Sequence, residues 1–525
     1  MAEPVGKFEL SRARRSLFRA LLDAAAKHGA GREILVDADG RVLTYHDLIR
    51  ATLALGYALK RGTRPGESVG VMLPTGAAAA ISVFAISAYG RVPAMLNFTA
   101  GLQSLRTALA MADVKRVVTA HRFIELGKFE TLAEQLGREC KLIYLEDVRN
   151  SLPLGARAAA VVGKFAPNVV TARQRPDRPA AILFTSGTEG EPKGVVLSHY
   201  NILANVEQVN AHLEIFQHDV LFNPLPVFHC FGLTVGTFMP IFLGVKAVMH
   251  PTPRQPHEIV RRIREYGATI LLATDTFVSQ YIRAAGENDL STLRLAVCGA
   301  ERLRDETRQL ARHKCPVELL EGYGVTEASP VISANQPEAN RPGTVGHFMQ
   351  GVETRIEPVE GIRDGGRLLV RGPNVMLGYL NTDKPGTVHP PDGGWHDTGD
   401  IVSVDEEGYL SIRGRLRRFA KIGGETVSLT VVENCASALW PDHSHAAIVL
   451  RDERRSENIV LVTTNPRADR SELLVWARNH GVPELAVPKR VVVVDEIPVL
   501  GSGKTDYSGV ARLAAQPAES SSAAE

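Results

Sequence analysis

The stretch from Thr185 to Gly194 has the residue types that can hold a polyphosphate, reading Thr-Ser-Gly-Thr-Glu-Gly-Glu-Pro-Lys-Gly. Glycines let backbone N–H groups approach phosphate oxygens closely, hydroxyl groups donate further hydrogen bonds, and Lys193 supplies positive charge. The stretch fits neither the GxxxxGK[ST] pattern nor the dinucleotide pattern GxGxxG. Considered alone, it indicates nucleotide binding no more strongly than it indicates a plain surface loop.

Four later segments combine glycines with single polar or aromatic residues: Gly299–Glu301, Glu321–Glu327, Trp395–Asp400 and Gly501–Lys504. A fifth segment, Pro226–His229, places a histidine in an apolar run. The ring of Tyr323 lies between two glycines and so presents a flat face that backbone does not obstruct. A carboxylate such as Glu327 is the hard ligand that Mg²⁺ prefers where it bridges phosphates. Each segment also has a common structural explanation, because Thr-Gly-Asp is usually a turn and Gly-Ser-Gly-Lys a flexible loop.

The set as a whole, in this order, resembles the motifs of the adenylate-forming superfamily of AMP-binding enzymes. That superfamily includes acyl-CoA synthetases, luciferases and nonribosomal peptide adenylation domains, and the resemblance covers nearly the whole chain. It implies ATP contacts at Thr185, Ser186, Gly187, Thr188, Glu189, Gly190, Lys193, Gly299, Ala300, Glu301, Gly322, Tyr323, Gly324, Thr326, Asp400, Arg415 and Lys504. Family membership does not by itself establish activity.

The resemblance also implies a role for single residues. Tyr323 would stack on adenine, and Asp400 and Arg415 would contact the ribose. The catalytic residues would be Lys504, Lys193, His229 and Thr188, and the Mg²⁺ ligands would be Glu327 and Thr188. His229 would lie near an acyl pocket, although a histidine in an apolar run is more often structural.

The implied reaction joins a carboxylic acid to AMP, releases pyrophosphate and then passes the acyl group to a thiol. Two anions must approach each other in the first step, so charge screening by Mg²⁺, Lys193 and Lys504 would be the main contribution to catalysis. The small C-terminal domain would then reorient about a hinge, removing Lys504 and bringing the region near Lys421–Glu425 to the acyl-adenylate.

Two departures from the family pattern narrow the resemblance. Glu189 stands where a second threonine is usual, and Arg418 stands at a hinge position usually held by aspartate or lysine. Both are shared with the acyl-carrier-protein synthetase half of the bacterial bifunctional 2-acylglycerophosphoethanolamine acyltransferase/synthetases. The likeness extends to Phe231–Gly236, Arg418–Ile422 and His480–Pro488. It implies a long-chain fatty acid as substrate and the phosphopantetheine thiol of acyl carrier protein as acceptor.

The acceptor has two alternatives. Five cations fall within nine residues, namely Arg413, Arg415, Arg417, Arg418 and Lys421. They could face an acidic carrier protein, as favoured above, or the 3′-phosphate of coenzyme A, or solvent. A long- or medium-chain fatty acyl-CoA ligase is therefore the alternative function. A second alternative is a non-catalytic sensor of ATP or acyl-AMP, against which the intact lysines and carboxylates argue.

The fused acyltransferase half would need a His-x4-Asp motif, and none of the 16 histidines has aspartate at that spacing. We therefore expect the synthetase half alone. Acyl chain length is not readable, because pocket depth depends on distant segments such as Val235–Leu243 and Gly299–Leu303.

Composition argues against several other classes of protein. Sixty basic and 58 acidic residues give a net charge of +2, which argues against a nucleic-acid partner. Five scattered cysteines without CxxC spacing indicate neither disulfides nor zinc, and the first residues do not form a secretory signal. We expect a cytoplasmic protein with no transmembrane segment.

Residues 10–27 predict a basic amphipathic helix. We favour docking of this helix on the chain itself, and contact with the inner face of the membrane is the alternative.

The order of predicted elements indicates an α/β protein of more than one domain, since 525 residues exceed one ordinary core. Strand-like runs alternate with helical stretches up to about residue 350, which predicts largely parallel sheets flanked by helices, and a small β subdomain follows. We expect a large adenylation domain at residues 1–414, a hinge at 415–418, a small mobile α+β domain at 419–513 and a disordered tail at 514–525.

Overall fold

The computed structural model describes residues 8–186, 192–362, 364–422, 425–451, 457–499 and 505–515. The chain divides into two compact units, and each is described by itself. The first comprises Met1–Glu353 and Arg371–His396, and the second comprises Thr354–Val370 and Asp397–Glu525. The mixed α/β fold predicted from the sequence is confirmed. The domain limits and the hinge at 415–418 stay predictions, and the expected tail lies outside the described residues from 516 onward.

A nine-stranded sheet, counted over the described residues, carries much of the first unit, in the order β15-β14-β13-β12-β11-β9-β10-β1-β2. Its strands are β1 (Glu33–Val36), β2 (Val42–Thr44), β9 (Val220–Asn223), β10 (Lys246–Met249), β11 (Ile270–Ala273), β12 (Leu295–Cys298), β13 (Leu319–Gly324), β14 (Val331–Ala334) and β15 (His347–Phe348). The strands from β1 through β13 in this order pair parallel. Their carboxyl ends therefore meet at one edge of the sheet.

A second sheet of the first unit has, in the described part of the chain, the order β18-β8-β7-β4-β3-β5-β6. Its strands are β3 (Ser68–Val71), β4 (Val92–Met95), β5 (Arg116–Thr119), β6 (Lys141–Tyr144), β7 (Pro179–Ser186), β8 (Pro192–Ser198) and β18 (Gly378–Leu380). Strands β7 and β8 form an antiparallel pair, in which Thr185 lies opposite Lys193. This hairpin presents both ends of the predicted phosphate loop.

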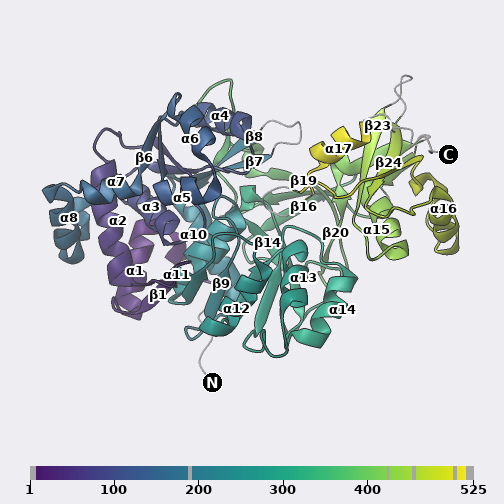
Figure 1. Ribbon diagram of the computed structural model, residues 1–525, viewed down its shortest axis with the longest axis horizontal. Helices are drawn as coiled ribbons and strands as arrows, with labels where there is room; N and C mark the ends of the chain where they lie inside the picture. Colours follow the sequence, from purple (N-terminus) through teal and green to yellow (C-terminus); the bar gives the residue numbers. More distant parts are fainter. Residues whose placement is uncertain are drawn as a thin grey trace, which may run out of the picture. The chain divides into compact units, whose positions relative to one another are not determined.

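Helices cover the two sheets of the first unit (Figure 1). They are α1 (Leu17–His28), α2 (Tyr45–Leu59), α3 (Ala77–Ala88), α4 (Leu102–Met111), α5 (His121–Gly127), α6 (Glu130–Gly137), α7 (Leu145–Asn150), α8 (Leu154–Phe165), α9 (Pro167–Val170), α10 (His199–His212), α11 (Met239–Leu243), α12 (Pro256–Tyr266), α13 (Asp275–Ala284) and α14 (Asp305–Lys314). Two successive residues of β9 face opposite sides of the nine-stranded sheet and join different hydrophobic cores. Phe222 joins a core with α12–α14, and Leu221 joins the core that contains α3 and α10.

The predicted N-terminal helix is interrupted in the structure. A 3₁₀ turn at Leu10–Ala13 is followed by Arg14 in a non-helical conformation, and α1 begins only after Ser16. The interruption has a local cause, because the Ser16 hydroxyl accepts a hydrogen bond from the backbone N–H of Arg19 and so caps α1. Leu17 and Leu21 are fully buried, which confirms docking on the chain itself. Within the described residues, no helix has the length and apolar character to cross a membrane.

The second unit is built on smaller sheets (Figure 1). Its strands are β16 (Glu353–Glu357), β17 (Gly366–Arg371), β19 (His396–Val404), β20 (Leu410–Arg415), β21 (Phe419–Ile422), β22 (Glu425–Ser428), β23 (His445–Arg451), β24 (Glu457–Thr463) and β25 (Arg490–Val493), and its helices are α15 (Leu429–Leu439), α16 (Arg470–Asn479) and α17 (Tyr507–Ala515).

Arg418 is held by the packing of the second unit. Its guanidinium donates to a carboxylate oxygen of Glu433 at 2.8 Å and to the carbonyl oxygen of Ala447 at 3.1 Å. It also lies 3.8 Å from the ring centroid of Tyr507, whose hydroxyl is 3.1 Å from the same Glu433 oxygen. These contacts join the start of β21 to α15, β23 and α17, so the side chain at the predicted hinge is a structural part of this unit.

His199 fixes the start of α1 onto α10. Its Nδ1 accepts a hydrogen bond from the backbone N–H of Leu17 at 3.2 Å, and its Nε2 lies 3.0 Å from the side-chain oxygen of Gln174. This pair of contacts requires the neutral ring with its proton on Nε2. Burial lowers the pKa of His199 from 6.5 to about 4.

Protonation of His199 should therefore weaken the first unit in mild acid. The folded-state pKa lies below the unfolded value, so the stabilisation is complete above pH 6.5 and is lost as the pH falls toward 4. We expect the native chain to lose up to about 3 kcal/mol from this group over that range. Denaturant unfolding from pH 7 to 4 measures it. His199→Gln should flatten the profile, and the exposed His257→Gln should not; identical slopes for both would contradict the assignment.

Candidate nucleotide and acyl site

Two glycine-containing segments meet at the carboxyl edge of the nine-stranded sheet. Strands β12 and β13 pair with Cys298 opposite Glu321, so Gly299 and Ala300 follow beside Gly322. A Cβ added to Gly299 would lie 3.1 Å from the ring of Phe231 and 3.6 Å from the carbonyl oxygen of Gly322. Ala300 has a left-handed backbone with φ of 69°. The backbone is thus closely packed where the sequence predicts contacts with adenine.

An apolar cavity of about 70 Å³ opens against these segments. Gly299, Ala300 and Gly322–Gly324 form one side of it. Aliphatic and aromatic residues form the rest: Val209, Leu213, Ile215, Phe231, Val235, Met239, Ile270, Leu272, Leu295, Val297, Pro330, Val331, Ala334 and Met349. The two segments expected to shape an acyl pocket, Val235–Leu243 and Gly299–Leu303, both contribute to the lining.

A buried ion pair lies beneath the Gly322–Gly324 segment. Glu321 binds the guanidinium of Arg308 from α14, and both side chains are nearly inaccessible to solvent. The same carboxylate accepts hydrogen bonds from the backbone N–H groups of Leu303 at 3.2 Å and Gly343 at 3.1 Å. Glu321 therefore connects the loop after β12, the loop before β15 and α14 to the strand that carries Tyr323.

Glu301 is engaged elsewhere. Its carboxylate accepts a hydrogen bond from the backbone N–H of Thr276 at 2.9 Å, in the first turn of α13, and burial raises its pKa. The structure thus shows a supporting contact for this side chain, and its predicted contact with the nucleotide stays a prediction.

Glu327 and Lys193 approach one aromatic ring. Thr326 and Glu327 lie in a 3₁₀ turn at Thr326–Ala328, and the Tyr379 hydroxyl donates to a carboxylate oxygen of Glu327 at 2.6 Å. The ammonium of Lys193 lies 5.1 Å from the centroid of the Tyr379 ring. Tyr379 was not among the residues predicted from the sequence. It reaches the site because β18 pairs with β8 and places Tyr379 opposite Val195.

A π-helix positions His229. The helical segment at Phe231–Phe238 has π geometry, a form often found at functional sites, and it begins two residues after His229. Gly232 is required here, since an added Cβ would lie 2.4 Å from the carbonyl oxygen of Pro226. The His229 ring packs against Phe228 with centroids 4.8 Å apart.

Cys230 lies beside His229 but is not poised as a nucleophile. Burial raises the pKa of its thiol to about 12, and the charge of Glu327 adds to the shift. The thiol therefore stays protonated near neutral pH. All five cysteines of the chain are free.

Asp400 and Arg415 meet within the second unit. They lie opposite each other in the β19–β20 pair, and the Arg415 guanidinium donates to the buried Asp400 carboxylate at 2.9 Å. The two predicted ribose contacts are thus brought together, although their role in binding stays a prediction. Gly187, Thr188, Glu189, Gly190 and Lys504 lie outside the described residues.

The predicted Mg²⁺ ligands include one described carboxylate, Glu327. Among the described residues no group of three or more histidine, cysteine, aspartate or glutamate side chains could hold a metal ion. A single carboxylate still fits Mg²⁺ in a nucleotide site, because this ion keeps several waters and takes its other ligands from phosphates. Tyr379 fixes the orientation of that carboxylate.

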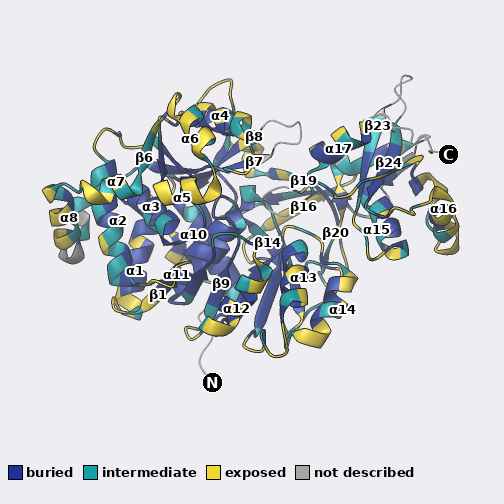
Figure 2. Ribbon diagram, in the orientation of Figure 1, coloured by how far each residue is buried: buried dark blue, intermediate teal, exposed yellow. Residues whose placement is uncertain are grey.

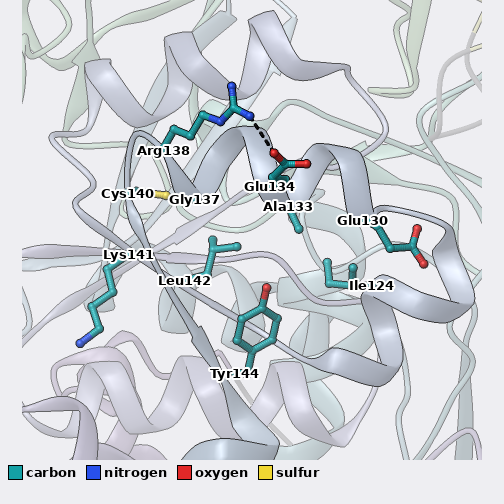
Figure 3. A pocket seen from close by; sticks show the side chains of 10 residues that line it. All are labelled: Ile124, Glu130, Ala133, Glu134, Gly137, Arg138, Cys140, Lys141, Leu142 and Tyr144. Atoms are coloured by element: carbon teal, nitrogen blue, oxygen red, sulfur yellow. Dashed lines mark hydrogen bonds and ion pairs between the residues drawn. The ribbon is translucent and has the colours of Figure 1, made fainter.

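A larger hollow of about 660 Å³ lies at the edge of the seven-stranded sheet, between α6 and β6 (Figure 3). Its charged residues are of both signs, and Arg138 pairs with Glu134 at 2.7 Å. None of the residues predicted for ATP or acyl binding lines it. We therefore assign the candidate site to the smaller cavity beside Tyr323.

Comparison with known proteins shows the family to which the chain belongs. Residues 21–380 match the family described as AMP-binding enzyme, and the chain therefore belongs to that family. It is 30% identical over 340 residues to a medium-chain fatty-acid–CoA ligase of Escherichia coli, and the matched region covers 62% of this chain and 60% of that protein. It is 29% identical to a long-chain-fatty-acid–CoA ligase of Bacillus subtilis, over 94% of both chains.

The fold also matches solved structures. The crystal structure of ATP-bound MatB from Rhodopseudomonas palustris superposes with a TM-score of 0.81 at 26% identity, covering 95% of this chain and 98% of that one. The two relatives named above are CoA ligases, so the carrier-protein branch suggested by the sequence stays a prediction.

Breaking the buried pair under Tyr323 should destabilise the first unit. Arg308→Ala leaves the Glu321 charge buried without its partner, and we expect a loss of about 3 kcal/mol in the free energy of unfolding. Denaturant titration measures this loss. The exposed Arg312→Ala on the same helix should change stability by less than about 0.5 kcal/mol. The double variant Arg308→Met/Glu321→Leu should recover part of the loss, and equal stability of Arg308→Ala and Arg312→Ala would contradict the role of the pair.

Proposed function

We propose that this protein uses ATP to activate a fatty acid as its acyl-adenylate, and then transfers the acyl group to a phosphopantetheine thiol. The observation that carries the proposal is that the segments predicted to contact ATP also line the apolar cavity. Gly299, Ala300 and Gly322–Gly324 border an otherwise apolar compartment. If Tyr323 stacks on adenine, an alkyl chain in that compartment brings its carboxylate to the α-phosphate.

In the proposed first step a carboxylate oxygen attacks the α-phosphorus, and the bond from that phosphorus to the pyrophosphate oxygen breaks. A neutral-pH carboxylate is already ionised, so no general base is required. The protein must instead screen two anions as they approach each other. Lys193 and Lys504 would supply positive charge, and Mg²⁺, when bound, neutralises phosphate charge.

The described residues support distinct parts of this scheme. Glu327, oriented by Tyr379, would hold the metal ion, and Tyr379 would also keep Lys193 near the same phosphates. Asp400 is already paired with Arg415, so the two could bind the ribose hydroxyls together. His229 would border the carboxylate end of the acyl chain, at the start of the π-helix that also contributes Val235 to the cavity.

The second step gives a thioester and releases AMP when the thiol sulfur attacks the acyl carbonyl. Coenzyme A is the acceptor in the names of the relatives from Escherichia coli and Bacillus subtilis. Acyl carrier protein is favoured by the segments Arg418–Ile422 and His480–Pro488. Both acceptors present the same phosphopantetheine thiol, so the proposed chemistry is common to them.

Fatty-acid-dependent exchange of labelled pyrophosphate into ATP tests the adenylation step. We expect the native chain to catalyse exchange with palmitate, and Lys504→Ala to lower the rate by about 100-fold, because a charge that stabilises the transition state is lost. Lys489→Ala, an exposed lysine of the same unit, is the matched control and should retain activity. Binding of ATP without exchange in the native chain would instead indicate a sensor and overturn the proposal.

A competition assay identifies the acceptor. ATP, palmitate, acyl carrier protein and coenzyme A are supplied together, and the thioester product is identified by mass. We expect palmitoyl carrier protein to exceed palmitoyl-CoA, as the C-terminal segments suggest. Predominance of palmitoyl-CoA would remove the carrier-protein assignment and leave a fatty acyl-CoA ligase, while adenylation itself would stand.

A further inference from the structure

The large apolar side chains that the structure describes on helix α8 are exposed, whereas three of its small residues, Ala156, Ala159 and Gly163, are buried. Leu154, Val161 and Val162 are 81%, 63% and 45% exposed, whereas Ala156 and Ala159 are nearly inaccessible. Helical spacing places Leu154 and Val161 on one face. A helix that only covered its own protein would have the opposite arrangement.

The buried face of α8 is fitted closely to α2. A Cβ added to Gly163 would lie 2.4 Å from a methyl carbon of Leu53, and one added to Gly155 would lie 2.6 Å from the Tyr57 hydroxyl. The small residues therefore let the two helices approach, and the larger side chains have no room on that side. Figure 1 shows α8 outside α2 at the margin of the first unit, and Figure 2 colours part of α8 yellow for exposed residues.

Exposed apolar residues are concentrated in this segment. Six large apolar side chains are exposed among the described residues of the first unit, and four of them lie between 154 and 169, the fourth being Val169 after α9 begins. Scattered single exposures need no explanation, but such a cluster marks an interaction surface. We call Leu154, Val161, Val162 and Val169 the α8 apolar face.

The same segment carries charge of one sign. Residues 148–176 contain Arg149, Arg157, Lys164, Arg173 and Arg175 and no acidic residue. Lys60 and Arg61 add two cations at the end of α2, where both lie over the ring of Tyr57 at 4.0 and 5.8 Å from its centroid. Of the flanking acids, Asp147 pairs with His121, and Asp177 pairs with Arg175, so Asp177 and Arg175 together add no net charge.

We propose that α8 and the start of α9 dock this protein onto an anionic lipid bilayer. A helix that combines an apolar face with flanking cations lies in the interface plane, with its side chains in the acyl boundary and its cations among the headgroups. Arg157 lies next to the apolar face on the exposed side of α8, so its guanidinium can reach lipid phosphates while its stem covers the apolar surface.

Other occupants fit the same surface less well. A second copy of the chain would bring like charges together, which opposes association. Protein partners favour aromatic and arginine anchors seated in pockets, whereas the α8 apolar face has only leucine and valine on the outside of a helix. The proposal does not depend on the proposed enzymatic function.

Vesicle sedimentation tests the proposal with the full chain. Vesicles of phosphatidylcholine containing about one third phosphatidylglycerol are compared with phosphatidylcholine alone. We expect the native chain to bind the anionic vesicles about tenfold more strongly, and Leu154→Asp/Val161→Asp to reduce that binding about tenfold. Arg157→Glu/Arg173→Glu should also weaken it. Leu126→Asp, at an apolar residue 73% exposed on α5, is the matched control and should bind as the native chain does.

Thermal unfolding and ATP–pyrophosphate exchange of each variant separate docking from folding and from adenylation. Both should match the native chain, since none of these residues lines the candidate site. Equal vesicle binding by Leu154→Asp/Val161→Asp and Leu126→Asp would overturn the proposal. So would a native dimer that the double variant converts to monomer, or retention on an acidic polypeptide such as polyglutamate without vesicle binding. Vesicle binding without exchange would overturn only the proposed enzymatic function.

Discussion

The candidate site depends on the buried ion pair between Arg308 and Glu321. Both charges are nearly inaccessible to water, so each needs the other. The Glu321 carboxylate also accepts hydrogen bonds from backbone N–H groups of two loops. Charged groups in such a setting tolerate few geometries, because a displaced partner leaves an uncompensated charge. The ion pair therefore specifies where the segment carrying Tyr323 and the loop carrying Ala300 lie relative to each other.

Parallel pairing of the strands in the nine-stranded sheet places the remaining residues of the candidate site. The parallel strands β9, β11, β12 and β13 run toward one edge of the sheet. Neighbouring positions at this edge are therefore held by Asn223 at the end of β9, Thr274 and Gly299 directly after β11 and β12, and Gly322 in β13. Asn223 is fully buried, and its amide donates to the carbonyl oxygen of Gly232 at 3.1 Å while its oxygen accepts from the N–H of Leu225. These bonds hold the turn that presents His229 and the π-helix, so one sheet edge supports both the glycine segments and the acyl-side residues.

The sequence was sufficient for the parts of the fold that depend on local pattern. The alternation of strand-like runs with helical stretches predicted the mixed α/β fold. Glycine-flanked Tyr323 and the order of the motifs predicted the segments that border the cavity. Pairing between distant strands was not readable, and Tyr379 was missed because only the β8–β18 pair brings it to Glu327. The hydrogen bond from the Thr276 N–H to Glu301 could not be predicted from the sequence either, because it depends on how α13 packs against the loop after β12.

Helices α1 and α8 show why amphipathic periodicity does not decide which face is buried. Each has one arginine and one lysine among apolar residues. Helix α1 buries Leu17 and Leu21 against the body of the first unit, while α8 exposes Leu154. The difference lies in residue size. Alanine and glycine at 156, 159 and 163 permit close approach to α2, and that contact is short enough to exclude leucine or valine from the same side. Close helix packing therefore forces the larger apolar side chains of α8 outward, where only an apolar partner such as a bilayer can remove them from water.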